Sequence, residues 1–152
     1  TGEKSGKIIA ELEHASFQYG DKLDKQLLAS YIFNDKHKLA IANSIIHPEV
    51  DRHFCEWLER YQHHHIVALE AAILYESGME RLTDKVIVVY TPLEDRIQRT
   101  MLRDNTTREK VLERINSQLS DDEKLKRADY VVYNDETKSL IQQSIKIIEN
   151  IK

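Results

Sequence analysis

Three short apolar runs, separated by helical patterns, limit the folds open to this chain more than any other feature. They occupy residues 66–69 (IVAL), 85–90 (KVIVVY) and 129–133 (DYVVY). Because none of them alternates apolar with polar residues, each is typical of a strand buried on both faces, as in parallel sheets. Strands that alternate with helices indicate an α/β domain. We therefore predict a parallel sheet with helices on both faces.

Composition fits one folded domain and excludes several classes of protein. Hydrophobic residues make up 41% and charged residues 32% of the 152 residues, as in globular proteins. The net charge of −4 gives no electrostatic reason to expect nucleic-acid binding. The single cysteine, Cys55, cannot form an internal disulfide, and no apolar run is long enough to span a membrane. We therefore predict a cytoplasmic protein that binds neither nucleic acid nor membranes.

A helix start follows the second apolar run directly. In residues 91–105 (TPLEDRIQRTMLRDN), Thr91 and Glu94 have the spacing of a capping box, and Pro92 suits the first helical position. An apolar stripe that includes Ile97 has helical spacing. The pattern therefore predicts a helix that begins immediately beyond the strand.

Three arginines fall on one face of this predicted helix. Arg96, Arg99 and Arg103 share a narrow stripe when the period is about 3.6 residues. Guanidinium groups match the geometry of phosphate oxygens, so a stripe of this kind beyond a strand can hold a polyphosphate. Alternatively, the arginines form a solvated face and pair with Glu94 and Asp95. On this stretch alone both interpretations stay open.

A proline interrupts the helical pattern in the first half of the chain. Residues 25–33 and 36–46 each show helical spacing, and His47 and Pro48 follow them. Because proline suits the first turn of a helix and disrupts its interior, we predict a break between His47 and Pro48 and a new helix opened by Pro48.

Six segments of the chain follow one another in the order and spacing of a known family. They are KLDKQLLASYIFND (22–35), IIHPEV (45–50), EAAILYESG (70–78), RIQRTMLRDN (96–105), RINSQLSDDEK (114–124) and ADYVVYND (128–135). Each is weak by itself, but the ordered set resembles the dephospho-CoA kinase family. The family patterns are L-[DN]-R-x-x-L…-[VI]-F, I-x-H-P, D-x-P-L-L-F-E, R-x-x-R…R-D-N, R-I-x-x-Q…K and A-D-x-V-I-x-N.

The resemblance implies a P-loop kinase-like fold, a three-layer α/β/α domain with a parallel sheet, a helical lid and an acceptor-binding region. The implied single domain covers residues 1–152, with the acceptor-binding helical part at about 1–62, core strands at 66–69, 85–90 and 129–133, and the lid at about 99–120. The implied activity is that of a transferase. Such a kinase uses ATP and Mg²⁺ to phosphorylate the 3′-hydroxyl of dephospho-coenzyme A, the last step of coenzyme A biosynthesis.

On the nucleotide side, the resemblance implies that Arg103 contacts the phosphates and the transition state, with Arg99 and Asn134 as further ATP-binding residues. Asn134 ends the last predicted strand, where ligands gather in such sheets, although an ordinary turn asparagine is the alternative. No residue is expected to hold a metal ion. Residues 63–65 (HHH) are consecutive, so their side chains cannot converge on one ion from a regular helix or strand.

On the acceptor side, the resemblance implies that Lys25, His47, Glu70 and Glu76 bind the substrate. Lys25 stands where the family has arginine, so it keeps the charge but loses the bidentate fork. His47 can line the acceptor pocket or cap the helix opened by Pro48. One of the two glutamates can organise the acceptor or magnesium-bound water, and Glu76 can instead cap the following turn.

The chain departs from the family at its first residues. The family's glycine-rich loop, G-x-x-x-x-G-K-[ST], and its base aspartate have no counterpart, because three residues separate Gly2 from Gly6 and isoleucine follows Lys7. In the family, the strand before this loop lies between the counterparts of residues 66–69 and 85–90. We therefore expect a gap in the sheet there, and a chain that is a fragment of a longer protein or that another chain completes. These residues alone are then expected to be inactive.

Two other functions remain open. The chain can be another small-molecule P-loop kinase, of the nucleoside monophosphate kinase type, although the I-x-H-P and A-D-x-V-I-x-N counterparts favour dephospho-CoA kinase. It can also be a non-catalytic, ligand-binding remnant, because the parts that turnover requires are missing from the printed sequence.

Overall fold

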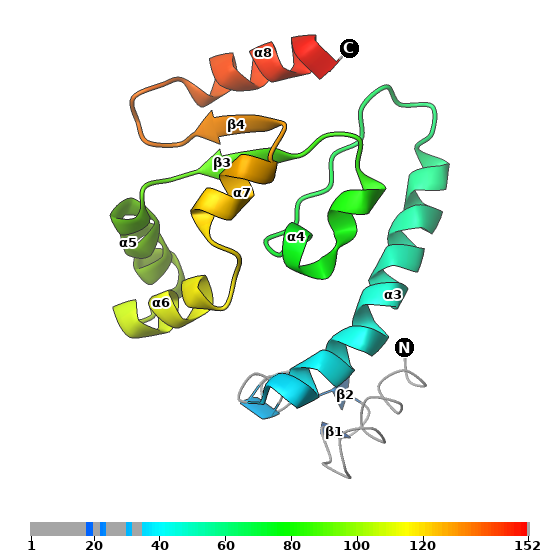
Figure 1. The fold of residues 1–152 in the computed structure, drawn as a ribbon, viewed down its shortest axis with the longest axis vertical. Helices are drawn as coiled ribbons and strands as arrows, with labels where there is room; N and C mark the ends of the chain where they lie inside the picture. Colours follow the sequence, from blue (N-terminus) through cyan, green and yellow to red (C-terminus); the bar gives the residue numbers. More distant parts are fainter. Residues whose placement is uncertain (1–17, 20–21, 24–29, 32–34, 152) are drawn as a thin grey trace. The chain divides into compact units, whose positions relative to one another are not determined.

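The computed structural model describes residues 18–19, 22–23, 30–31 and 35–151, so the predicted acceptor residue Lys25 lies outside the described residues. The chain divides into two units, Thr1–Leu69 and Glu70–Lys152. The elements of each unit are labelled in Figure 1.

The first unit is built around one long helix. α3 (Lys36–Arg60) has 25 residues, and β1 (Gln18–Tyr19) pairs antiparallel with β2 (Lys22–Leu23) ahead of it. Asp35 caps α3, because its carboxylate accepts the backbone N–H of His37 at 2.9 Å. Neither α3 nor any other described helix has, over a sufficient length, the apolar side chains that a membrane span requires.

Pro48 lies inside α3, so the break predicted between His47 and Pro48 is wrong. A proline removes one backbone N–H and crowds one carbonyl, and the remaining bonds of a long helix outweigh that local loss. His47 therefore sits within the helix, partly exposed, and not at a helix start. This placement excludes the alternative in which His47 caps a helix opened by Pro48.

The second unit contains the predicted parallel sheet. β3 (Ile87–Tyr90) pairs in parallel with β4 (Tyr130–Tyr133), so that Ile87 lies opposite Tyr130 and Tyr90 opposite Tyr133. Figure 1 shows the helices around this pair, with α8 along β4 and α7 beside β3. The α/β class with a parallel sheet is confirmed. The other elements are α4 (Leu74–Ser77), the helical turn η1 (Met79–Leu82), α5 (Leu93–Asp104), α6 (Arg108–Asn116), α7 (Asp121–Arg127) and α8 (Leu140–Ile151).

Residues 66–69 form no strand in the described structure, contrary to the prediction. A strand requires an adjacent backbone with which to exchange N–H and C=O bonds, and no described strand pairs with this run. Among the described strands β3 pairs with β4 alone, so no strand lies along its other edge. The apolar side chains of Ile87 and Val89 on β3 are exposed.

The buried side chains described in the second unit come from the sheet, from three α-helices and from Met79 of η1. Ile97 of α5 is fully buried, as its place in the predicted apolar stripe requires. Val132 of β4, Ile147 of α8 and Val111 of α6 are also buried. One face of α5 is therefore buried, α5 packs against α6, and the opposite face of α5 is left for polar contacts.

The start of α5 differs from the prediction. α5 begins at Leu93 and no side chain caps it, so the capping box predicted from Thr91 and Glu94 is wrong. The Glu94 carboxylate instead accepts two hydrogen bonds of 2.7 Å from the Arg108 guanidinium. This bidentate, charge-assisted pair joins α5 to α6.

Candidate functional site

The carboxyl ends of β3 and β4 meet at one edge of the sheet. The backbone N–H of Asn134 donates to the carbonyl oxygen of Tyr90 at 2.8 Å, which continues the strand pairing by one residue. The rings of Tyr90 and Tyr133 are in edge-to-face contact, with centroids 5.9 Å apart. Asn134, a predicted ATP-binding residue, is therefore held at the edge where parallel sheets bind ligands.

Arg99 of α5 reaches the connection that follows Asn134. Its Nη2 atom lies 3.1 Å from Oε1 of Glu136, whose backbone has a φ of 65°. The two side chains are 41% and 86% exposed, so water and salt screen the pair and it contributes little to stability. The contact places two predicted nucleotide-binding residues, Arg99 and Asn134, in the same part of the sheet edge.

Arg103 lies in the last turn of α5 and is the most exposed of the three arginines. Its Nε donates to Oδ1 of Asp104 at 2.7 Å, and its side chain is 74% exposed. Arg114 of α6 binds the other oxygen of Asp104 at 3.0 Å. The hydrogen bond from Arg103, together with the one from Arg114, holds the pKa of Asp104 below its ordinary value. Arg103 is thus oriented by a neighbouring carboxylate while its guanidinium stays accessible.

The turn at the end of α5 explains why asparagine suits the last position of the R-D-N segment. Asn105 ends α5 in the left-handed conformation, with a φ of 47°, and its N–H donates to the carbonyl of Met101. Asparagine tolerates this conformation better than most residues. Asp104 and Asn105 therefore shape the junction of α5 and α6 and hold Arg103 at it.

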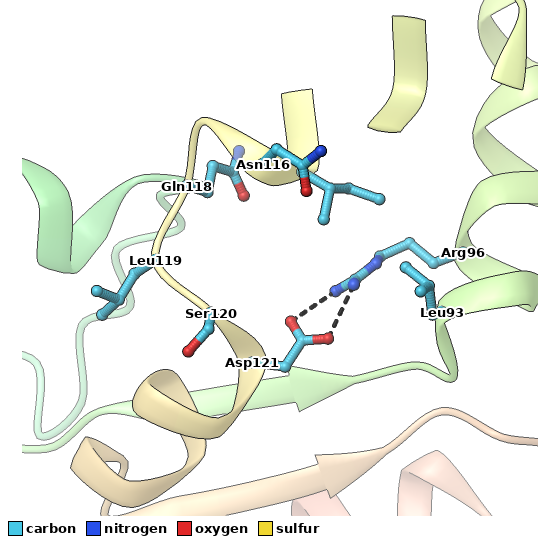
Figure 2. A pocket seen from close by; sticks show the side chains of 8 residues that line it. Leu93, Arg96, Asn116, Gln118, Leu119, Ser120 and Asp121 are labelled. Atoms are coloured by element: carbon cyan, nitrogen blue, oxygen red, sulfur yellow. Dashed lines mark hydrogen bonds and ion pairs between the residues drawn. The ribbon is translucent and has the colours of Figure 1, made fainter. Parts of the chain in front are cut away.

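Arg96 has a different environment from Arg99 and Arg103. Its Nη1 and Nη2 atoms form a bidentate pair with the Asp121 carboxylate, at 2.9 and 2.8 Å. Figure 2 shows this pair beside a pocket of about 390 Å³. Arg96 therefore forms a salt bridge, but the predicted partners Glu94 and Asp95 are wrong, because the partner is Asp121 at the start of α7. The pocket is lined by Leu93, Arg96, Ile115, Asn116, Gln118, Leu119, Ser120 and Asp121.

Glu76 is bound within the fold. Its Oε1 atom accepts the backbone N–H of Leu119 at 2.6 Å and lies 3.3 Å from Nζ of Lys124. Burial by itself would raise the pKa of Glu76, but the Leu119 N–H and the Lys124 ammonium outweigh it, so the pKa lies below its ordinary value. The other predicted acceptor glutamate, Glu70, is exposed at the start of the same unit.

The remaining predicted residues are placed only in part. His47 belongs to the first unit, as part of α3, and Lys25 lies outside the described residues. The three histidines at 63–65 are exposed. Within the described part of the chain, no three His, Cys, Asp or Glu side chains lie close enough together to hold a metal ion.

Two residues that shape the sheet were missed in the sequence. At its amino end, the Asp129 carboxylate accepts the backbone N–H of Val86 and the Lys85 ammonium, both at 2.9 Å, and Lys85 lowers the pKa of Asp129. At the carboxyl end, the Gln143 amide binds both the N–H and the C=O of Tyr133, as an adjacent strand would. A charged residue before an apolar strand, and a polar residue on an apolar helix face, are the signals that could have identified them.

A parallel sheet followed by an arginine-lined helix pair is typical of P-loop kinase-like phosphotransferases. Solved structures support this class. A crystal structure of TT1252 from Thermus thermophilus matches with a TM-score of 0.80 and 31% identity, over 97% of this chain and 74% of that one. A dephospho-CoA kinase from Campylobacter jejuni matches with a TM-score of 0.65 and 28% identity, over 99% and 76% of the two chains.

The chain belongs to the dephospho-CoA kinase family, whose model matches residues 2–139. A dephospho-CoA kinase from Bacteroides fragilis is 41% identical over 142 residues, which are 93% of this chain and 69% of that protein. One from Listeria monocytogenes is 39% identical over 125 residues, or 81% and 62% of the two. The resemblance predicted from the six segments is therefore confirmed. Members of this family are ATP-dependent phosphotransferases of coenzyme A biosynthesis.

Proposed function

We propose that this chain takes part in the ATP-dependent phosphorylation of the 3′-hydroxyl of dephospho-coenzyme A, in the cytoplasm. Membership of the family supports the reaction. One observation in the structure supports a nucleotide site: Arg99 of α5 binds Glu136, two residues beyond Asn134, at the carboxyl edge of β3 and β4. Ligands of parallel sheets bind at this edge.

Arg103, Arg99 and Asn134 form the nucleotide side of the proposed site. Phosphoryl transfer spreads negative charge over the oxygens of the migrating group, so fixed positive groups nearby lower the barrier. Arg103 is exposed and already oriented by Asp104, which suits a contact with phosphate. Arg99 can exchange its exposed partner Glu136 for a phosphate oxygen, and Asn134 can bind near the base.

Lys25, His47 and Glu70 are each proposed to bind the acceptor, from their places in the family's segments. A lysine attracts the phosphate groups of the acceptor as a point charge, without the two-point geometry of an arginine. His47 and Glu70 offer a ring nitrogen and a carboxylate for hydrogen bonds to hydroxyl groups.

Magnesium enters the proposal with the nucleotide. Mg²⁺ usually keeps several waters and binds through substrate phosphates, with few protein ligands. The described residues contain no group of three His, Cys, Asp or Glu side chains that could hold it by themselves. The glycine-rich loop and base aspartate that the transfer uses in this family have no counterpart in these 152 residues.

An assay of the gene product that contains this chain tests the proposal. The protein is incubated with ATP, Mg²⁺ and dephospho-coenzyme A, and formation of coenzyme A and ADP is followed. Adenosine monophosphate serves as the competing acceptor. We expect phosphorylation of dephospho-coenzyme A alone. Preferential phosphorylation of the monophosphate would favour the nucleoside monophosphate kinase alternative, and binding without turnover would favour a non-catalytic remnant.

A further inference from the structure

We propose that Glu76 is a positioning residue that fixes the segment between α6 and α7, and through it the orientation of the arginine helix α5. The inference rests on the proposed function, because its effect on activity is exerted through Arg99 and Arg103. It assigns Glu76 a role other than direct contact with the acceptor.

The contacts of Glu76 join parts of the chain that are far apart in sequence. Its carboxylate, on α4, accepts the N–H of Leu119 at 2.6 Å, and these residues are 43 positions apart. Nζ of Lys124, on α7, lies 3.3 Å from the same oxygen and donates to Oε1 of Gln118 at 3.2 Å. One carboxylate and one ammonium therefore hold two consecutive residues of the α6–α7 segment.

The ion pair of this cluster is less exposed to solvent than the Arg99–Glu136 pair. The side chains of Glu76 and Lys124 are 23% and 18% exposed, whereas those of Arg99 and Glu136 are 41% and 86% exposed. Water and salt screen a partly buried pair less than an exposed one. Removal of the Glu76 carboxylate would also leave a backbone donor at Leu119 and a cation at Lys124 without this partner.

The held segment leads directly to α5. Asp121 lies two residues after Leu119 and binds both terminal nitrogens of Arg96, as Figure 2 shows. Arg96 shares its helix face with Arg99 and Arg103. A continuous set of contacts therefore runs from Glu76 through Leu119 and Asp121 to α5. If Glu76 is removed, we expect the segment to move, and Arg99 and Arg103 to lose their orientation toward the nucleotide phosphates.

The test compares three variants of the gene product that contains this chain. Glu76→Ala removes the acceptor and the charge, and Glu76→Gln keeps an acceptor for Leu119 but loses the charge. Glu123→Gln is the matched control, because it makes the same charge change at an exposed glutamate of α7 whose partner, Lys126, lies 3.7 Å away on the same helix. The readouts are hydrogen exchange of the Leu119 amide and separate values of kcat and KM for ATP and for dephospho-coenzyme A.

For Glu76→Ala we expect the hydrogen-exchange rate of the Leu119 amide and the KM for ATP each to rise about tenfold. This is about the effect of losing one hydrogen bond to a charged group. For Glu76→Gln we expect a smaller rise in both, and for the control none. The KM for dephospho-coenzyme A should stay within about twofold in every variant. If Glu76→Gln folds but Glu76→Ala does not, the proposal is tested by comparing Glu76→Gln with the control Glu123→Gln in both readouts.

Two results would overturn the proposal. One is unchanged exchange at Leu119 in a folded Glu76 variant. The other is a raised KM for dephospho-coenzyme A with an unchanged KM for ATP, which would make Glu76 an acceptor contact. The exchange measurement needs no substrate, so it tests the Glu76 contacts even if the protein phosphorylates a different acceptor.

Discussion

The two ends of the arginine helix α5 differ in how their charges are held. At the amino-terminal end, Arg96 is bound at two points by Asp121, beside the segment that Glu76 holds. At the carboxyl-terminal end, Arg99 and Arg103 bind carboxylates, and their side chains are 41% and 74% exposed. The same residue type therefore serves two purposes: partly buried pairs build the fold, and exposed pairs can exchange their partner for a phosphate.

The largest effect we expect is on stability, at the buried side of α5. Ile97→Ala should lower the free energy of unfolding by about 2–5 kcal/mol, because Ile97 is fully buried and its truncation leaves a cavity. Leu102→Ala is the control on the same helix, where an 85% exposed side chain should change stability by no more than about 0.5 kcal/mol. Urea denaturation measures both. Equal losses would show that α5 does not have a buried and an exposed side.

The second effect concerns catalysis at the exposed end. Arg103→Ala in the gene product should lower kcat/KM about a hundredfold, because a cation that faces the transferred phosphoryl group is lost. Arg108→Ala is the control, since Arg108 is also an exposed arginine and pairs with Glu94. It should stay within about threefold. Unchanged kinetics in Arg103→Ala would remove this residue from the site.

The predictable and unpredictable parts of the structure have different physical origins. The strands within 85–90 and 129–133 could be predicted from their continuous apolar runs, although Ile87 and Val89 are exposed, so β3 is not buried on both faces as those runs indicate. The run at 66–69 has the same composition, but whether it forms a strand depends on a partner that local sequence does not reveal. The predicted helix break at Pro48 is wrong for a related reason, because a long helix can tolerate the loss of one backbone hydrogen bond.

The sequence predicts which residue types form the candidate site, but not which residues each of them binds. The arginine stripe and Asn134 follow from helical spacing and strand ends, which are local properties. The pairing of Arg96 with Asp121 spans 25 residues, and that of Glu76 with Leu119 spans 43. Contacts of that range depend on how α4, α5 and α7 pack, so sequence spacing alone cannot distinguish a residue that binds phosphate from one that positions it.

A third prediction uses the pH dependence of stability to distinguish the bound carboxylate of Glu76 from the exposed carboxylate of Glu123. The pKa of Glu76 lies below its ordinary value of 4.5, so its stabilisation is complete above that pH and is lost as the pH falls through the lowered value. Glu76→Gln should therefore reduce the loss of unfolding free energy on acidification from about pH 6 to pH 3. Glu123→Gln, which makes the same charge change on α7, is measured under the same conditions for comparison. An identical acid profile for both variants would contradict a bound, ionised Glu76.

The smallest effect is expected at the most exposed pair. Glu136→Gln should lower the KM for ATP by about two- to threefold, because the carboxylate competes with phosphate for Arg99 and the pair itself is weak. The comparison is made at low and high salt, since screening should reduce the difference. A higher KM in the variant would mean that Glu136 assists nucleotide binding.

NMR spectroscopy tests most directly whether Arg96 serves the fold while Arg99 and Arg103 bind phosphate. The measurement follows the arginine Nε–Hε resonances of the gene product during a titration with ATP and Mg²⁺. We expect the signals of Arg99 and Arg103 to shift with ATP while that of Arg96, bound to Asp121, stays in place. A shift at Arg96 with none at Arg99 and Arg103 would contradict the account, because the phosphates would then bind at the end of the helix that we assign to the fold.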